Sequence, residues 1–103
     1  MDRKPHLKPD AIGKRLEALR LALGKIAAEV CRDTDFAPHA WSQWENGKVR
    51  LSLDSALVLC ERYDVTLDYI FRGSFAGLPL DLAEKVKKKL IAPVPAADRR
   101  QKA

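Results

Sequence analysis

The chain has 103 residues, 47% apolar and 32% charged, which is enough for one folded domain and too short for two. No run of residues approaches the roughly 20 consecutive apolar positions of a membrane span, and no apolar run follows the charged N-terminus as it would in a secretory signal. The two cysteines, Cys31 and Cys60, lie far apart and outside any CxxC motif. We therefore expect reduced thiols and a cytoplasmic protein.

The net charge of +5 is concentrated at the C-terminal end of the chain. Residues 1–84 carry a net charge of −1, whereas residues 85–103 carry +6. A basic segment of this kind attracts polyanions such as nucleic acids. It is equally typical of a solvated end that keeps the protein soluble. Charge alone leaves both interpretations open.

Three helices are predicted in the N-terminal half. Residues 1–9 contain two prolines and are expected to form an irregular arm, after which Asp10 stands where an N-cap belongs. The first helix ends at Gly24, the second spans residues 26–32 before a turn-forming Asp33–Phe36 segment, and the third spans residues 38–46. Apolar side chains recur at helical spacing and are expected to face a core; they are Ile12, Leu16, Leu19, Leu23, Ile26, Val30, Trp41 and Trp44.

Three further helices are predicted in the C-terminal half. Ser52 is expected to cap the fourth helix and Thr66 the fifth, which ends at Gly73. The inward side of the fourth helix is predicted to comprise Leu53, Ala56, Leu57, Cys60 and Tyr63. The sixth helix carries Leu82, Val86 and Leu90 four residues apart, with Lys85, Lys87, Lys88 and Lys89 facing water. No strand is predicted, so the fold class is all-α.

Two sequence stretches carry a resemblance to a known family. Two short helices joined by a tight turn, behind a longer first helix, describe a helix-turn-helix. The stretches SQWENGK (residues 42–48) and VTLDYIFRG (residues 65–73) resemble the XRE/Cro-like, phage-repressor-like family of helix-turn-helix domains. The resemblance extends from Ile12 to Gly73. The predicted organisation is a flexible arm (1–9), a five-helix DNA-binding domain (10–73), a linker with a C-terminal helix (74–92) and a disordered basic tail (93–103).

The resemblance implies which side chains face DNA. They lie at the start of the second helix, on the third helix and in the loop that follows: Ala27, Pro38, His39, Ala40, Gln43, Asn46, Lys48 and Arg50. A glutamine amide can bond bidentately to adenine, and basic side chains in the loop suit phosphate contacts. The resemblance further implies that Arg20 pairs with Glu45, tying the first helix to the third.

Several positions depart from the residues usual in this family. Ala27 replaces a common Gln, and Pro38 removes a side chain that could reach a base. Asp35 stands where the turn usually has Gly, and together with Asp33 it is expected to put negative charge near the approaching DNA backbone. Base reading should therefore depend mainly on His39 and Gln43.

No catalytic constellation is evident. His6 and His39 have no carboxylate and nucleophile at helical spacing, and no HExxH motif, zinc-ligand spacing or phosphate-binding glycine loop occurs. We expect no enzyme activity, no cofactor and no metal. Cys31 and Cys60 could approach each other in the core, where two packed thiols are favoured over a redox disulfide.

The sequence thus predicts a sequence-specific transcriptional regulator, a repressor that binds operator DNA as a homodimer. The alternative is a protein-interaction module on the same fold, antitoxin-like or anti-repressor-like, with weak or no specific DNA binding. The dimer contact is expected on apolar side chains too numerous for one short helix to cover: Tyr69, Phe71, Phe75, Leu78 and Leu80. The competing interpretation is that the sixth helix folds back and covers them within one chain.

Overall fold

The computed structural model describes residues 5–91; the predicted disordered tail lies outside them. Within this range the chain forms a short 3-10 helix, six α-helices and no strand, so the predicted all-α fold is confirmed. The elements are η1 (Pro5–Leu7), α1 (Pro9–Ala22), α2 (Ala27–Thr34), α3 (Pro38–Glu45), α4 (Leu53–Tyr63), α5 (Leu67–Arg72) and α6 (Leu80–Ile91). No helix in this part of the chain is both long and apolar enough to cross a membrane.

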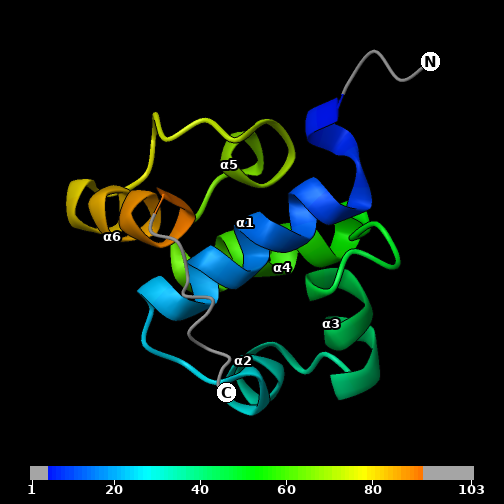
Figure 1. Ribbon diagram of the computed structural model, residues 1–103. Coiled ribbons are helices and arrows are strands. Elements are labelled where there is room, and N and C mark those ends of the chain that lie inside the picture. Colours follow the sequence, from blue (N-terminus) through cyan, green and yellow to red (C-terminus); the bar gives the residue numbers. More distant parts are fainter. Residues whose placement is uncertain (1–4, 92–103) are drawn as a thin grey trace, which may run out of the picture.

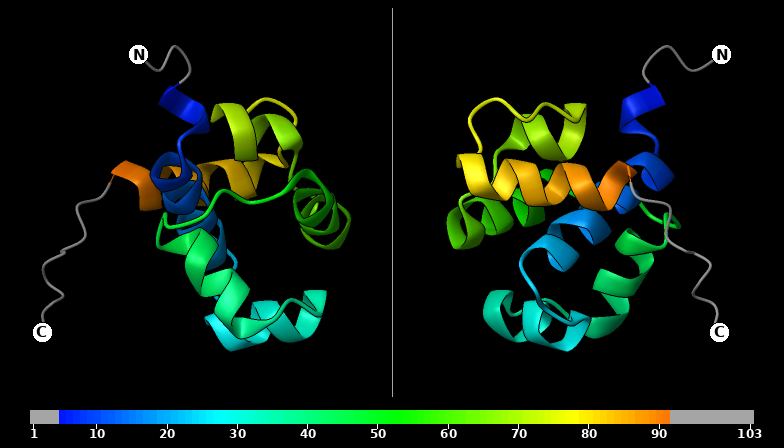
Figure 2. Two further views of the ribbon diagram at one scale, coloured as in Figure 1. Left: turned by 90° about the vertical axis from the view of Figure 1, so that its right-hand side faces the viewer. Right: turned by 60° about the vertical axis from the view of Figure 1, so that its left-hand side comes forward.

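Helix α1 is the centre of the arrangement. It crosses the middle of the molecule and contacts α3, α5 and α6 (Figure 1). In both turned views, α2 and α3 lie at one end of the molecule, and α5 and α6 lie toward the other (Figure 2). The largest side chains of the core are fully buried: Ile12, Leu16, Leu19, Val30, Trp41, Leu51, Leu59, Tyr69, Ile70 and Val86.

Two helix boundaries differ from the prediction. Helix α1 begins at Pro9 with Lys8 as the N-cap, so Asp10 lies in the first turn and does not cap the helix. Proline suits this first position because its missing N–H is one that the helix would leave unpaired. Helix α2 continues through Thr34, whose hydroxyl donates to Val30 O at 2.7 Å, and the chain turns only at Asp35, with φ of 67°.

The predicted caps of the last two core helices are confirmed. The Ser52 hydroxyl accepts a hydrogen bond from Ser55 N at 3.1 Å at the start of α4. The Thr66 hydroxyl accepts one from Tyr69 N at 3.0 Å at the start of α5. Each cap satisfies a backbone donor that the first helical turn would otherwise leave free.

The predicted inward side of α4 is wrong in part. Ala56 and Leu59 are fully buried, whereas Leu53 and Leu57 are 56% and 42% exposed. The buried pair and the exposed pair both have helical spacing, so periodicity could not decide which pair faces the core. The packing of α4 against α2 and α5 selects the side that carries Ala56 and Leu59.

The predicted dimer surface is largely covered within the chain. Tyr69 and Leu78 are buried, and Phe71 and Phe75 are partly buried against the core. Helix α6 folds back onto α1, burying Leu82, Ala83 and Val86 and placing the Lys87 ammonium 5.1 Å from the centre of the Phe75 ring. Of the five predicted interface side chains only Leu80 is largely exposed. These side chains therefore pack largely within the chain, while α6 itself lies mainly against α1 and reaches this region through Lys87 and Phe75.

Candidate nucleic-acid interface

Helices α2 and α3 pack against each other across a turn of three residues, Asp35–Ala37. The left-handed conformation of Asp35 ends α2, and Pro38 starts α3 with the φ that a first helical position needs. Phe36 anchors the turn: its ring centre lies 6.2 Å from that of Trp41 and 5.1 Å from that of Trp44. The turn is therefore held by aromatic packing as well as by its backbone.

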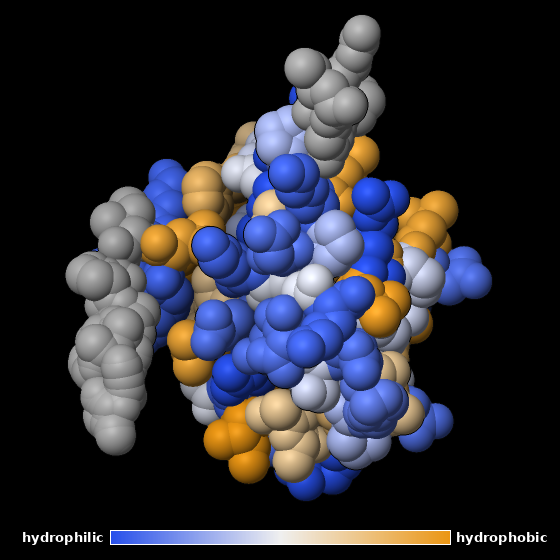
Figure 3. Space-filling view, turned by 45° about the vertical axis from the view of Figure 1, so that its right-hand side comes forward, coloured by the Kyte–Doolittle hydropathy of each residue, from blue (hydrophilic) through white to orange (hydrophobic). Residues whose placement is uncertain are grey.

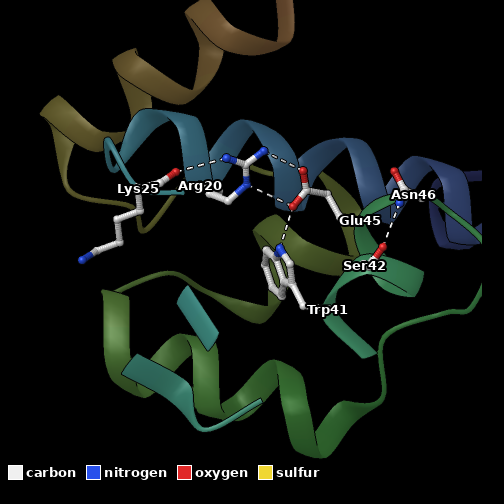
Figure 4. A network of polar contacts seen from close by, with 6 residues as sticks. All are labelled: Arg20, Lys25, Trp41, Ser42, Glu45 and Asn46. Atoms are coloured by element: carbon white, nitrogen blue, oxygen red, sulfur yellow. Dashed lines mark hydrogen bonds and ion pairs between the residues drawn. The ribbon is translucent and has the colours of Figure 1, made fainter. Parts of the chain in front are cut away.

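A network of charged and aromatic groups joins α3 to α1 (Figure 4). Arg20 donates through Nε and Nη2 to the two carboxylate oxygens of Glu45, at 3.0 and 2.8 Å. The indole N–H of Trp41 donates to the same carboxylate at 2.6 Å, and Arg20 Nη1 donates to Lys25 O at 3.1 Å. The Arg20 and Glu45 side chains are only 16% and 14% exposed. The structure thus brings together the pair that the resemblance implies, and the bonds to Glu45 raise the pKa of Arg20.

A close backbone approach beside this network escaped sequence reasoning. A Cβ on Gly13 would lie 2.6 Å from Glu45 O and 2.7 Å from Trp44 O, so only glycine lets α1 meet the end of α3. Gly47 has φ of 75°, and a Cβ there would lie 2.8 Å from the Cα of Asp10. The signal available in the sequence was a glycine inside a helix, which usually marks close packing or a break.

The residues implied to face DNA lie mostly on the surface. Ala27, Pro38, His39, Asn46, Lys48 and Arg50 are exposed, and Ala40 and Gln43 are partly buried. Gln43 Nε2 lies 3.3 Å from His39 Nε2, so the two expected base readers touch each other one turn apart on α3. Asn46 Nδ2 donates to Ser42 Oγ at 3.1 Å. The face that includes α3 is largely hydrophilic, with apolar groups in separate places (Figure 3).

An apolar cavity of about 250 Å³ lies between α2 and α3. It is lined by Ala27, Ala28, Cys31, Pro38, Trp41, Ser42, Glu45 and Asn46. Ala27 and Pro38, one from each helix, thus both put a small apolar group on this cavity. A surface of this kind suits an apolar contact, such as a thymine methyl group, better than a hydrogen bond.

Asp33 does not add free negative charge to this surface, contrary to the expectation. Its carboxylate accepts a hydrogen bond from Tyr63 Oη at 2.8 Å and pairs with Lys25 Nζ at 3.0 Å. These two contacts, the bond from Tyr63 first, lower the pKa of Asp33. Asp33 therefore links α2 to α4, a contact between distant residues that no local pattern indicates. Asp35 alone remains an exposed carboxylate at the turn.

Both cysteines are free thiols, Cys31 buried and Cys60 partly buried. Burial raises the pKa of each thiol, so both stay protonated and pack as small apolar groups.

Comparison with known families gives one match, to a helix-turn-helix domain, over residues 11–69. The chain belongs to the helix-turn-helix domain family. The match begins in α1 and ends in α5, so it takes in the whole α2–α3 unit and the network that holds it, and it lies inside the predicted domain of residues 10–73. No curated protein and no solved structure matches the chain.

Proposed function

We propose that this protein is a DNA-binding transcriptional regulator of the XRE/Cro-like kind, a cytoplasmic repressor that binds operator DNA as a homodimer without a cofactor. The observation that supports it most is the position of α3. One side of this helix is tied to α1 through Arg20, Trp41 and Glu45, and the other side leaves His39 and Gln43 accessible at the surface. A firmly held helix with accessible polar side chains is what major-groove reading requires.

In this proposal α3 enters the major groove with its N-terminal turns nearest the bases. Gln43 bonds to adenine N6 and N7, and His39 donates to a purine N7. Pro38 and Ala27, which line the apolar cavity, contact a thymine methyl group. Lys48 and Arg50, exposed in the loop after α3, neutralise phosphates and set the position of the helix without reading sequence.

Two copies are needed because one copy has so few base readers. A dimer places two recognition helices on half-sites about one helical turn apart, about 34 Å, which doubles the number of bases read. Bound across a promoter, such a dimer excludes other proteins from the same DNA, which is the simplest route to repression.

The alternative function is a protein-interaction module that uses the same fold. The apolar cavity between α2 and α3 favours it, because a surface without amide donors at Ala27 and Pro38 can hold an apolar side chain of a partner protein. An antitoxin-like or anti-repressor-like role fits this reading, together with the near-neutral charge of residues 1–84.

Selection from random duplex DNA, followed by binding measurements at several salt concentrations, tests the proposal. Gln43→Ala should weaken binding to the selected site by about 1–3 kcal/mol and relax the preference at one base pair. Lys48→Ala should weaken binding to all sequences and reduce the salt slope by about 1. The matched control is Arg72→Ala, because Arg72 is an exposed cation on α5, which lies toward the other end of the molecule from α2 and α3 (Figure 2), and it is outside the basic segment of residues 85–103.

Failure to recover any preferred sequence, with binding to mixed DNA absent even at low salt, would contradict DNA recognition and favour the interaction module. Substituting uracil for thymine in the selected site adds a direct test of the apolar contact. Loss of the methyl group should weaken wild-type binding at one position.

A further inference from the structure

Helices α1 and α6 border an open hollow of about 310 Å³ at the molecular surface. It is lined by two apolar side chains at the end of α1, Leu21 and Ala22, and by three lysines of α6, Lys85, Lys88 and Lys89. Leu21 is 42% exposed although α6 packs along α1. This surface, which we call the α1–α6 hollow, is therefore apolar on the α1 side and basic on the α6 side.

The three lysines of the hollow carry charges that no ion pair neutralises within residues 5–91. Their spacing of three and four residues places them on one side of α6, where like charges repel one another. Lys87, on the same helix, differs from them because its ammonium lies 5.1 Å from the centre of the Phe75 ring. A negatively charged partner would remove the repulsion among the three lysines.

The acidic side chains of the two helices near the hollow do not line it. They are Glu17 on α1 and Asp81 and Glu84 on α6. All three are exposed, and none comes within ion-pair distance of a lysine of α6. The basic character is therefore local to the hollow and comes from its three lysines.

We propose that the α1–α6 hollow binds an acidic segment of a partner protein. An apolar side chain of that segment packs on Leu21 and Ala22, and the carboxylates on either side of it pair with the three lysines. Charge complementarity favours this occupant over the chain itself, because residues 92–103 contain three basic side chains and one acidic one. A second copy of the hollow would set lysines against lysines. A nucleic-acid backbone would neutralise the lysines but has no apolar side chain to cover Leu21.

The hollow and the candidate nucleic-acid interface lie in different parts of the molecule. Helices α2 and α3 lie at one end, and α6 lies toward the other (Figure 2). A partner in the hollow leaves His39 and Gln43 accessible, so the chain can hold the partner and DNA at the same time. The inference thus goes beyond the proposed function and does not depend on it.

Fluorescence anisotropy of a labelled peptide, with glutamates on both sides of a central leucine, measures this binding to the full chain. Lys88→Glu should weaken binding about tenfold or more, because it replaces an attraction with a repulsion. Arg32→Glu is the matched control, since Arg32 is an exposed cation on α2 with no ion pair among the described residues and its substitution changes the net charge equally. At physiological salt, where distant charges are screened, Arg32→Glu should change binding by less than about twofold.

The apolar side of the hollow has its own test. Leu21→Ser should weaken binding several-fold, whereas Leu57→Ser, at a leucine on α4 with the same exposed fraction of 42%, should leave it unchanged. A peptide of the same charge with serine in place of leucine should bind the wild type more weakly and should lose little more on Leu21→Ser.

Three results would overturn the inference: no binding of the leucine peptide, equal effects of Lys88→Glu and Arg32→Glu, or equal binding of the leucine and serine peptides. Circular dichroism of each variant checks that the fold is kept. If Lys88→Glu weakens binding to mixed-sequence duplex DNA as much as it weakens peptide binding, the hollow is a nucleic-acid contact and the inference is wrong.

Discussion

Removing the Glu45 carboxylate should destabilise this protein more than removing any exposed charge. Glu45→Ala deletes two charge-assisted hydrogen bonds from Arg20 and one from the Trp41 indole. It leaves a guanidinium that is 16% exposed without its counter-ion, and an indole N–H without an acceptor. The cost comes mainly from these stranded groups, since a buried donor that loses its partner has already given up its water.

The magnitude follows from the geometry. Breaking a fully buried pair from one side costs about 3–5 kcal/mol. Arg20 keeps its bond to Lys25 O and some access to water, so we expect the lower end, about 3 kcal/mol. For a domain of about 100 residues this corresponds to a fall in Tm of about 12–24 °C. It is also a large part of the total stability of about 5–15 kcal/mol that such domains have.

The assay is urea unfolding followed by tryptophan fluorescence and circular dichroism, with an unchanged m-value as the condition for comparison. The matched control is Asp68→Ala, which removes an ion pair to Arg72 at 3.8 Å whose side chains are 62% and 71% exposed. This variant should cost less than about 1 kcal/mol. If Glu45→Ala costs no more than Asp68→Ala, the network does not hold α3 to α1, and the firm attachment assigned to the recognition helix is wrong.

Three further predictions concern packing, pH and the tail. Gly13→Ala should destabilise by about 1–3 kcal/mol despite the better helix propensity of alanine, because its Cβ meets two backbone carbonyls. An unchanged or raised stability in urea unfolding would contradict the close approach. Because the pKa of Asp33 is lowered in the folded state, the stability that its carboxylate contributes is fully present above the pKa of about 3.9 that an aspartate has in the unfolded chain. That stability is lost as the pH falls through the lower pKa of the folded chain. Tyr63→Phe should therefore flatten the loss of stability as the pH falls below about 4 in urea titrations, and an unchanged slope would refute the link. Deletion of residues 93–103 should weaken binding to mixed-sequence DNA more than it changes specificity, and an unaltered salt slope would mean that the tail takes no part.

Local patterns were sufficient to predict the six helices, although not all of their boundaries. The apolar spacing, the caps at Ser52 and Thr66 and the left-handed glycines depend on neighbours a few residues away, so the sequence carries that information directly. The pairing of Glu45 with Arg20, 25 residues apart, came from the resemblance carried by the SQWENGK stretch and not from a local pattern. The resemblance implied glycine at the position of Asp35, and Asp35 adopts the left-handed conformation that glycine favours.

The tertiary structure alone decided which apolar surfaces are buried. Leu53 and Leu57 have the same helical spacing as the buried side of α4, and Tyr69 and Leu78 were as apolar as any interface residue. The outcome depended on contacts between distant elements: α5 and α6 both pack against α1, whereas no element within residues 5–91 covers Leu53 and Leu57. Whether a side chain is buried depends on the surface that packs against it, and that surface is formed by residues distant in sequence. For this reason a helical pattern can specify that a side chain is apolar and cannot specify what it packs against.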